Sequence, residues 1–434
     1  MSLQEPEFND EEIMSFLKNP QMLNLIVDEY HRYHAGDTKL LKFLHIICAS
    51  RHTVSIWVNI SGSSRGGKDN AVRVVIDTFL GTGDTMEALR FTEHGLEYTE
   101  IPEQPVVLDG KIIYVSEEKG ISLALDTLRP IFEQKGKIKT VYSVGVERKG
   151  QKIQIIGCPT LIITAVTPNF DSQTMKRLWL HSIDESPIQT KEVQRLIKYI
   201  DSHPEEYKHK TRTMRLIEEA VKRYPKNAIV FIPYADYIEF PDEKVRTRGD
   251  LKKFLDFVKC VTFTHMFQRY RILKDEEITV ISDKLDFDMS REILSEIFEA
   301  SLTDVPNAVR EFYLQVKPAL DSVGQRESES DQILYPDGLK VKDIVRNTEK
   351  SDPTVRNYMD ILVKAGKVSK SYAGKQCCYF PTHSDFSSLT TIKDLVKVDF
   401  DRNQFNIERR YREFLNSAKP FTLIKPDGTE EMIV

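Results

Sequence analysis

The stretch Asn59–Val75, NISGSSRGGKDNAVRVV, decides the fold of the N-terminal half of the chain. It begins within VSIWVNI, a short apolar run rich in β-branched residues, and it leads into AVRVVIDTFL, which has helical periodicity. A strand, a glycine-rich loop and a helix in this order are the setting that a phosphate-binding loop requires. The stretch therefore predicts an α/β domain with a nucleotide site after its first strand.

The residues from Gly62 to Lys68 match the pattern GxxxxGK. Glycines let successive backbone N–H groups point at phosphate oxygens, the following helix adds the positive end of its dipole, and the lysine reaches the β- and γ-phosphates. A glycine-rich turn before a helix also occurs as plain architecture, so the flanking strands carry part of the argument. The predicted nucleotide-binding residues are Gly62, Ser63, Ser64, Arg65, Gly66, Gly67, Lys68 and Asp69.

Asp69 stands where a phosphate loop usually carries the serine or threonine that binds Mg²⁺. A carboxylate there is unfavourable beside a triphosphate unless a cation lies between them. The second buried strand, KIIYV, ends in SEEKG and leaves two arrangements open. In one, Ser116 and Glu117 take the magnesium and water-orienting roles, so that hydroxyl and carboxylate have exchanged places with the loop. In the other, Glu117 and Glu118 take these roles and Asp69 is a third acid. The predicted metal ligands are Asp69, Ser116 and Glu117.

The composition is that of an ordinary water-soluble protein with two or three domains. The 434 residues are 40% hydrophobic and 29% charged, and their net charge is −5. No apolar run approaches the roughly 18 residues that a membrane span needs. The N-terminus, MSLQEPEFNDEE, lacks the apolar core of a signal peptide, and five scattered cysteines show no zinc-binding spacing. We therefore expect a cytoplasmic protein with reduced thiols and no membrane partner.

Alternating strands and helices predict a parallel sheet, whose third strand, PTLIITAV, ends in TPN. Before it, the alternating runs KTVYSVGVE and QKIQII flank a turn at Arg148, Lys149 and Gly150, which predicts a long hairpin with a basic tip. Residues 190–320 have mainly helical patterns, and the polar stretch QRESESDQ is typical of a linker. We assign no function to the charged tail after Asp399.

A basic segment stands out near the C-terminus, with nine basic and four acidic residues between Gly338 and Pro381. Its pattern predicts a helix, a turn, a second helix capped by Ser351 or Asp352 ahead of Pro353, and a β-wing. This order resembles a winged-helix domain, whose second helix enters the DNA major groove while the wing contacts the backbone. The DNA-contacting residues would be Arg356, Asn357 and Lys364 on or near the helix and Lys370 and Lys375 on the wing. Protein docking is the alternative role.

The order of loop, SEE strand, hairpin and TPN strand resembles AAA+ ATPases that carry a β-hairpin just before the sensor-1 strand, the group of the MCM replicative helicases. Within that group the chain resembles the MCM-like helicases of phages, plasmids and other mobile elements, over roughly residues 24–270. The resemblance implies a P-loop core with a helical lid, ATP and Mg²⁺ as cofactors, and a homo-oligomeric ring, in this group a hexamer.

The resemblance also suggests roles for single residues. IITAVTP is similar to the end of the sensor-1 strand, but Thr167 replaces the amide residue found there, so Asn169 is a substitute candidate. TMKRLWLHSIDES is similar to the segment with the arginine finger, which places Arg177 in the neighbouring subunit's site. The lid arginine called sensor 2 would be Arg248, with Arg246 in reserve. Surface salt bridges and solvated charges are the alternatives for these arginines.

In a ring of this type the hairpin points into the central channel. Arg148, Lys149 and Lys152 would then contact the phosphate backbone, which carries no sequence information and suits a motor that steps over any sequence. A hairpin tip that is basic only for solubility is the alternative.

The predicted organisation has an α/β P-loop core at its centre. The segments are an N-terminal helical segment (1–50), the core with its hairpin (51–190), a helical lid (191–324), a linker (325–332), a winged-helix domain (333–384) and a tail (385–434). The implied function is an ATP-dependent helicase or replication ATPase that moves on single-stranded or forked DNA, with a separate loader, primase or initiator. The alternatives are a sequence-specific DNA-binding initiator or regulator that uses ATP as a switch, and a ring subunit that hydrolyses nothing.

Overall fold

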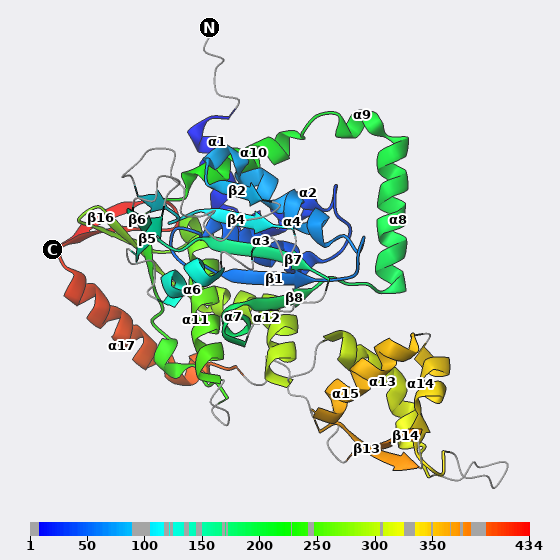
Figure 1. Cartoon of the computed structure of the whole chain (residues 1–434). Coiled ribbons are helices and arrows are strands. Elements are labelled where there is room, and N and C mark those ends of the chain that lie inside the picture. The colour runs from blue at the N-terminus through cyan, green and yellow to red at the C-terminus, as the bar shows by residue number, and fades with distance from the viewer. Residues whose placement is uncertain are drawn as a thin grey trace. The chain divides into compact units, whose positions relative to one another are not determined.

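Figure 1 shows the computed structural model of the chain. The structure describes residues 8–88, 105–116, 121, 125–133, 139–144, 150–166, 170, 172–226, 228–241, 247–303, 307–324, 335–348, 350–364, 366–373, 376–382 and 396–434. The chain forms two compact units, which are described separately below. The first contains Met1–Ile293 and Lys397–Val434, and the second contains Leu294–Val396.

A five-stranded parallel sheet lies at the centre of the first unit, in the order β2-β4-β7-β1-β8. Its strands are β1 (Trp57–Ser61), β2 (Thr85–Ala88), β4 (Ile112–Val115), β7 (Thr160–Ala165) and β8 (Trp179–Ser182). Because the carboxyl ends of parallel strands lie at one edge of a sheet, the glycine loop after β1 meets the ends of β4 and β7 there. The strand β7 lies between the loop strand β1 and the strand β4, so its end is next to both.

Helices cover both faces of this sheet, as an α/β fold requires. Alternate residues of β4 and β7, such as Ile113 and Ile163, pack in one apolar cluster with α6 (Leu125–Glu133). The residues between them face the other side, where α4 (Lys68–Ile76), α3 (Thr38–Ala49) and α11 (Thr247–Thr264) pack together. On that side Phe43 of α3 stacks on Phe257 of α11, with ring centroids 5.2 Å apart. The predicted α/β fold with a parallel sheet is confirmed.

The two alternating runs before β7 pair with each other, as their pattern predicts. The strands β5 (Lys139–Val144) and β6 (Gly150–Ile156) are antiparallel, and β3 (Val106–Val107) extends β6 in parallel to complete a three-stranded sheet. The turn between β5 and β6, with Arg148 and Lys149, lies outside the described residues.

A second five-stranded sheet, in the order β16-β15-β10-β11-β9, takes three of its strands from residues 190–320, where the described residues are otherwise mainly helical, as the sequence pattern predicts. Its strands are β9 (Ala228–Phe231), β10 (Arg271–Lys274), β11 (Glu277–Ile281), β15 (Phe421–Ile424) and β16 (Glu430–Ile433). The strands β10 and β11 are joined by Asp275 and Glu276, both with positive φ. Asparagine or aspartate followed by glycine is usual in such two-residue turns, so Asp275 followed by Glu276 is only a weak turn signal.

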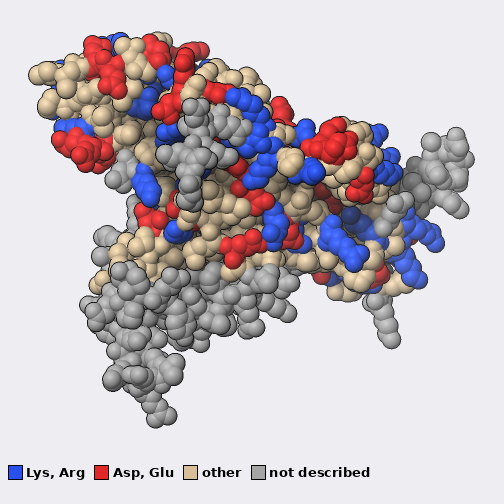
Figure 2. Space-filling model, turned by 90° about the horizontal axis from the view of Figure 1, so that it is seen from above, with Lys and Arg blue, Asp and Glu red and all other residues tan. Residues whose placement is uncertain are grey.

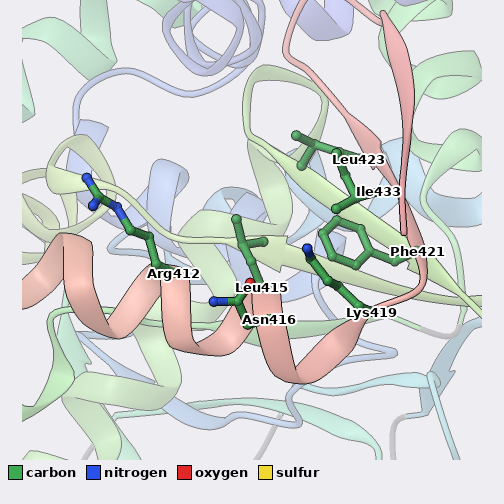
Figure 3. Close-up of a pocket in the computed structure, with 7 residues that line it drawn as sticks. All are labelled: Arg412, Leu415, Asn416, Lys419, Phe421, Leu423 and Ile433. Atoms are coloured by element: carbon green, nitrogen blue, oxygen red, sulfur yellow. The ribbon is translucent and has the colours of Figure 1, made fainter.

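The C-terminal segment belongs to this second sheet and is not a detached tail. The helix α17 (Phe400–Ala418) packs on it, and Phe414 stacks on Phe231 of β9 with ring centroids 4.0 Å apart. The strand β15 pairs antiparallel with β10. Figure 3 shows Leu415 of α17 facing Phe421 and Leu423 of β15 and Ile433 of β16. These side chains line a cavity of about 230 Å³. The many charges of α17 hid its apolar stripe in the sequence.

The first unit has further helices around the two sheets. They are α1 (Asp10–Lys18), α2 (Met22–Tyr30), α7 (Ser172–Arg177), α8 (Pro187–Ser202), α9 (Pro204–Tyr207), α10 (Arg212–Ala220) and the start of α12 (Lys284–Thr303). Among the described residues, no helix has the length and hydrophobicity needed to cross a bilayer.

The second unit is a small helical domain with a three-stranded sheet. Its helices α13 (Asn307–Asp321), α14 (Val341–Thr348) and α15 (Asp352–Lys364) pack around one apolar cluster with Leu339 and Tyr379. The sheet has the order β12-β14-β13, from β12 (Leu339–Lys340), β14 (Gln376–Pro381) and β13 (Val368–Ala373). Helix, turn, helix and antiparallel hairpin thus follow one another as the sequence pattern predicts.

The C-terminal segment should contribute measurably to stability. Phe421→Ala removes a ring that is 2% exposed, and we expect it to lower the free energy of unfolding by about 3 kcal/mol through lost burial and the cavity left behind. Phe405→Ala is the matched control, because the Phe405 side chain on α17 is 74% exposed and should lose almost nothing. Urea unfolding followed by fluorescence measures both, and equal effects would contradict the packing described above.

Candidate functional site

Glycines shape the loop between β1 and α4 in two different ways. Gly67 precedes the first residue of α4 and has a φ of 96°, a conformation that L-residues rarely adopt. Gly62 and Gly66 are required by packing, because a Cβ atom at either position would lie within 2.7 Å of the Ile183 side chain. The loop is therefore held against the segment that follows β8.

Lys68 folds back over this loop. Its side chain is buried, and Nζ donates a hydrogen bond to the backbone oxygen of Ser63 at 3.2 Å. The same nitrogen lies 4.0 Å from Oδ2 of Asp69. A lysine held by one neutral carbonyl and one distant carboxylate can exchange these partners for phosphate oxygens at small cost.

Asp69 ties the loop helix to the sheet. Its Oδ1 accepts hydrogen bonds from the Tyr114 hydroxyl at 2.7 Å and from the Thr164 hydroxyl at 2.6 Å. Tyr114 is in β4 and Thr164 in β7, and both point to the face of the sheet that α4 covers. Burial, together with the neighbouring Asp69, raises the pKa of Tyr114 well above its ordinary value, so its hydroxyl stays protonated and donates.

This arrangement gives Asp69 a structural role that sequence reasoning missed. Thr164 Oγ1 also lies 3.0 Å from the backbone oxygen of Ser116, so one hydroxyl links the loop helix to the end of β4. The Asp69 side chain is 45% exposed, and Oδ2 takes no part in these hydrogen bonds. The described donors fit a nucleotide phosphate at the loop and leave one carboxylate oxygen suited to Mg²⁺.

The segment after β8 covers the mouth of the loop. The carboxylate of Glu185 accepts a hydrogen bond from the backbone N–H of Ser63. Next to it, the backbone N–H of Asp184 donates to Asp37 at 3.0 Å, and Gln189 donates to the backbone oxygen of Ala35. Residues 33–37, which include these two acceptors, also contact the loop helix α4.

A partly buried polar network joins residues 33–37 to α4. His34 pairs with Asp37 at 2.9 Å, and both side chains are almost fully buried. The Asn70 side chain donates to the backbone oxygen of Tyr33 at 2.8 Å and lies 3.2 Å from Nδ1 of His34. The loop helix, residues 33–37 and the segment after β8 are thus one connected structure around the loop.

Arg177 lies at the opposite end of the sheet from the loop. It is the last residue of α7 and precedes β8, whereas the loop follows the far end of the parallel neighbour β1. A four-residue strand spans about 13 Å, so Arg177 is too far from the loop of its own chain to contact a phosphate bound there. Within its own helix it donates to the backbone oxygen of Gln173.

Arg248 lies in the first turn of α11 and is exposed. Five residues further along, Lys253 donates to the backbone oxygen of Leu178 at 2.9 Å and lies over the Trp179 ring. The start of α11 is therefore beside the α7–β8 junction, on the same side of the unit as Arg177.

Several predicted residues lie outside what the structure describes. They are Glu117, Glu118, Thr167, Asn169, Arg148, Lys149, Arg246 and Lys375, and the linker 325–332 is also outside. Lys152 belongs to β6, but its side chain is not among those described. Ser116 follows β4 directly and is half-buried.

The second unit has a basic groove of about 340 Å³ between α15 and the sheet. Arg356 and Lys370 line it together with Lys340, Lys342 and the exposed ring of Tyr372. Asn357 and Lys364 do not line this groove. Arg356 pairs with Asp352 and Lys370 with Asp360, at exposed positions where such pairs contribute little and exchange readily.

Comparison with known proteins supports the nucleotide site. Residues 7–220 match the model of a family described as the MTBMA_p00010 P-loop domain. This part of the chain is similar to a P-loop domain, and its parallel sheet and loop fit a P-loop NTPase core. The match covers β1, the loop, α4 and all of the parallel sheet. No curated protein matches the chain.

Three residues of the P-loop domain's site were not predicted from the sequence. Tyr114 and Thr164 are polar positions inside the buried runs KIIYV and PTLIITAV, a signal that could have marked them as partners of a buried group. Glu185 follows the short strand β8 in IDES, and nothing in that pattern indicates that it reaches the loop.

The bond between Tyr114 and Asp69 should be measurable as a coupling. Tyr114→Phe removes only the hydroxyl, and we expect it to lower the free energy of unfolding by about 1 to 2 kcal/mol because the Asp69 carboxylate loses a donor. In a double-mutant cycle with Asp69→Ala, measured by urea unfolding, the two effects should be non-additive by at least about 0.5 kcal/mol. Tyr270→Phe, at an exposed ring of the same unit, serves as the control, and its effect on the free energy of unfolding should be additive with that of Asp69→Ala. Additive effects for Tyr114 would contradict the contact.

Proposed function

We propose that this chain is an ATP-hydrolysing motor of the AAA+ type that assembles into a ring, with six copies as the expected number, and moves on DNA. The observation that carries the proposal is the separation of Lys68 and Arg177 on opposite ends of the parallel sheet. An arginine finger that cannot reach its own loop acts on the loop of a neighbouring copy. A site shared between copies is what a ring of such subunits requires.

The order of the sheet supports the same proposal. The strand β7, which the resemblance identifies as the sensor-1 strand, lies directly between β1 and β4. Its end is therefore placed between the phosphate loop and the acidic end of β4, where a γ-phosphate and the attacking water would lie. The paired strands β5 and β6 immediately before it fit a hairpin preceding that strand.

Each group has a defined task in this proposal. Loop N–H groups bind the phosphates, and Lys68 leaves Ser63 to contact the β- and γ-phosphates. Mg²⁺, held by Asp69 Oδ2 with Ser116 or Glu117, would neutralise charge on the phosphates. Glu117 or Glu118 would orient the water, and Arg177 of the neighbouring copy would stabilise the charge that develops in the transition state.

The basic groove of the second unit is the proposed DNA-contacting surface of a winged-helix domain. Four cations and an exposed tyrosine line this groove with a single carboxylate, that of Asp360. The surplus of positive charge and the exposed ring suit phosphates and an unpaired base better than an apolar protein partner. The net charge of the chain is −5, and Figure 2 shows acidic and basic side chains interspersed over the face drawn there. Attraction to DNA therefore depends on local groups such as these.

Mixing two inactive variants tests the shared site. Lys68→Ala and Arg177→Ala should each lower ATP turnover stimulated by single-stranded DNA by at least about a hundredfold. A mixture of the two variants should regain part of the activity, because some interfaces between copies combine the intact Lys68 of one copy with the intact Arg177 of the next. Arg195→Ala, on exposed α8, is a control that should leave turnover unchanged. No recovery on mixing would contradict a site between copies. Tight site-specific DNA binding without turnover would favour the initiator or regulator instead.

Salt dependence tests the groove. Arg356→Ala and Lys370→Ala should each weaken DNA binding across sequences and reduce the slope of log K against log salt by about 1, because each removes one phosphate contact. Lys425→Ala, in the first unit, should leave the slope unchanged. Fluorescence anisotropy with a labelled forked DNA measures all three, and unchanged slopes for the groove variants would contradict this surface.

A further inference from the structure

The side chain of Glu185 places a negative charge inside the phosphate loop. Its Oε1 accepts the backbone N–H of Ser63, the second residue of the loop. The same oxygen is 3.4 Å from the point that a Cβ atom would occupy on Gly62, and 3.1 Å from the corresponding point on Gly66. A carboxylate oxygen thus lies among the loop residues whose N–H groups would otherwise meet a phosphate oxygen.

We propose that Glu185 is an internal competitor of the nucleotide, which holds the loop until the phosphates of an incoming nucleotide displace it. The inference rests on the nucleotide-binding function proposed above and adds a regulatory group to the same site. Two anions cannot share one set of N–H donors, because their mutual repulsion is added to the loss of the hydrogen bond. The affinity of the protein for nucleotide is then lower than that of a loop without Glu185, because part of the binding free energy is used to displace this side chain.

The surroundings of Glu185 allow this displacement by side-chain rotation. The Glu185 residue is exposed, so its carboxylate can turn into water without opening the core. The backbone on both sides is fixed, because Asp184 donates to Asp37 and Ser186 caps α8 by accepting from the N–H of Gln189. The side chain can therefore leave the loop while the segment stays in place.

The helix α8 joins the segment that carries Glu185 to the outside of the subunit. It begins two residues after Glu185, and Gln189 is its one buried residue. Figure 1 shows α8 at the periphery of the first unit, away from the parallel sheet. Release of the Glu185 side chain therefore does not require α8 to move.

Three ligands distinguish this role from a general structural effect. Glu185→Gln keeps the size of the side chain and removes its charge, and Glu185→Ala removes the contact as well. We expect both variants to bind mant-ATP with Mg²⁺ about three- to tenfold more tightly than the wild type, as expected for one exposed charge-assisted hydrogen bond. Pyrophosphate, measured by competition, should gain by the same factor. Adenosine, which has no phosphate, should bind equally to all forms.

A matched control removes a charge elsewhere on the same segment. Glu192→Gln, at an exposed glutamate of α8 that pairs with Arg195, should leave all three affinities unchanged. The gain of the Glu185 variants should also shrink at high salt, because the repulsion between exposed charges is screened. Thermal melting confirms that each variant is folded.

Unchanged or weaker binding of mant-ATP and pyrophosphate by the Glu185 variants, with a wild type that binds both, would overturn the inference alone. An equal gain for adenosine would also overturn it, since the effect would not arise at the phosphates. If the folded wild type and the variants bind neither mant-ATP nor pyrophosphate, the proposed nucleotide function falls, and this inference with it.

Discussion

The hydrogen bonds from Tyr114 and Thr164 to Asp69 join the three parts of the P-loop domain's site. They connect the first turn of α4 to β4 and β7, so the loop helix and these two strands keep one spacing. A serine or threonine at position 69 would be too short to reach both hydroxyls while also serving a metal. The carboxylate that stands at position 69 in place of the usual hydroxyl therefore connects α4 to β4 and β7.

This connection depends on strand register. Tyr114 and Thr164 face α4 only because β4 and β7 pair in parallel with Tyr114 opposite Ile162. A shift of one residue would turn both hydroxyls into the apolar cluster under α6 and bring Ile113 or Ile163 against the Asp69 carboxylate. Burial of the alternate isoleucines on the α6 side thus fixes the position of the polar groups on the α4 side.

The parts that were predictable from sequence have strong local patterns. A buried β-branched run, a GxxxxGK loop and an apolar helix occupy consecutive residues, so the P-loop and the parallel sheet could be predicted. The helices and hairpin of the second unit are similarly local. The contacts at the site are not, because the partners of Asp69 are 45 and 95 residues away and Glu185 is 122 residues from Ser63. The second sheet could not be predicted for the same reason, because β10 pairs with β15, which comes from the far end of the chain.

The charges around the loop suggest how the site discriminates between its ligands. Lys68 provides one buried positive charge, and Asp69 and Glu185 place two negative ones within reach of the same loop. Two unit charges 4 Å apart interact by on the order of 1 to 4 kcal/mol between the limits of water and a protein surface. In the proposed function, a free triphosphate would be repelled by Asp69, whereas a triphosphate that carries Mg²⁺ would bring a positive charge to this carboxylate. The carboxylate at position 69 would then favour the metal-bound nucleotide over the free one.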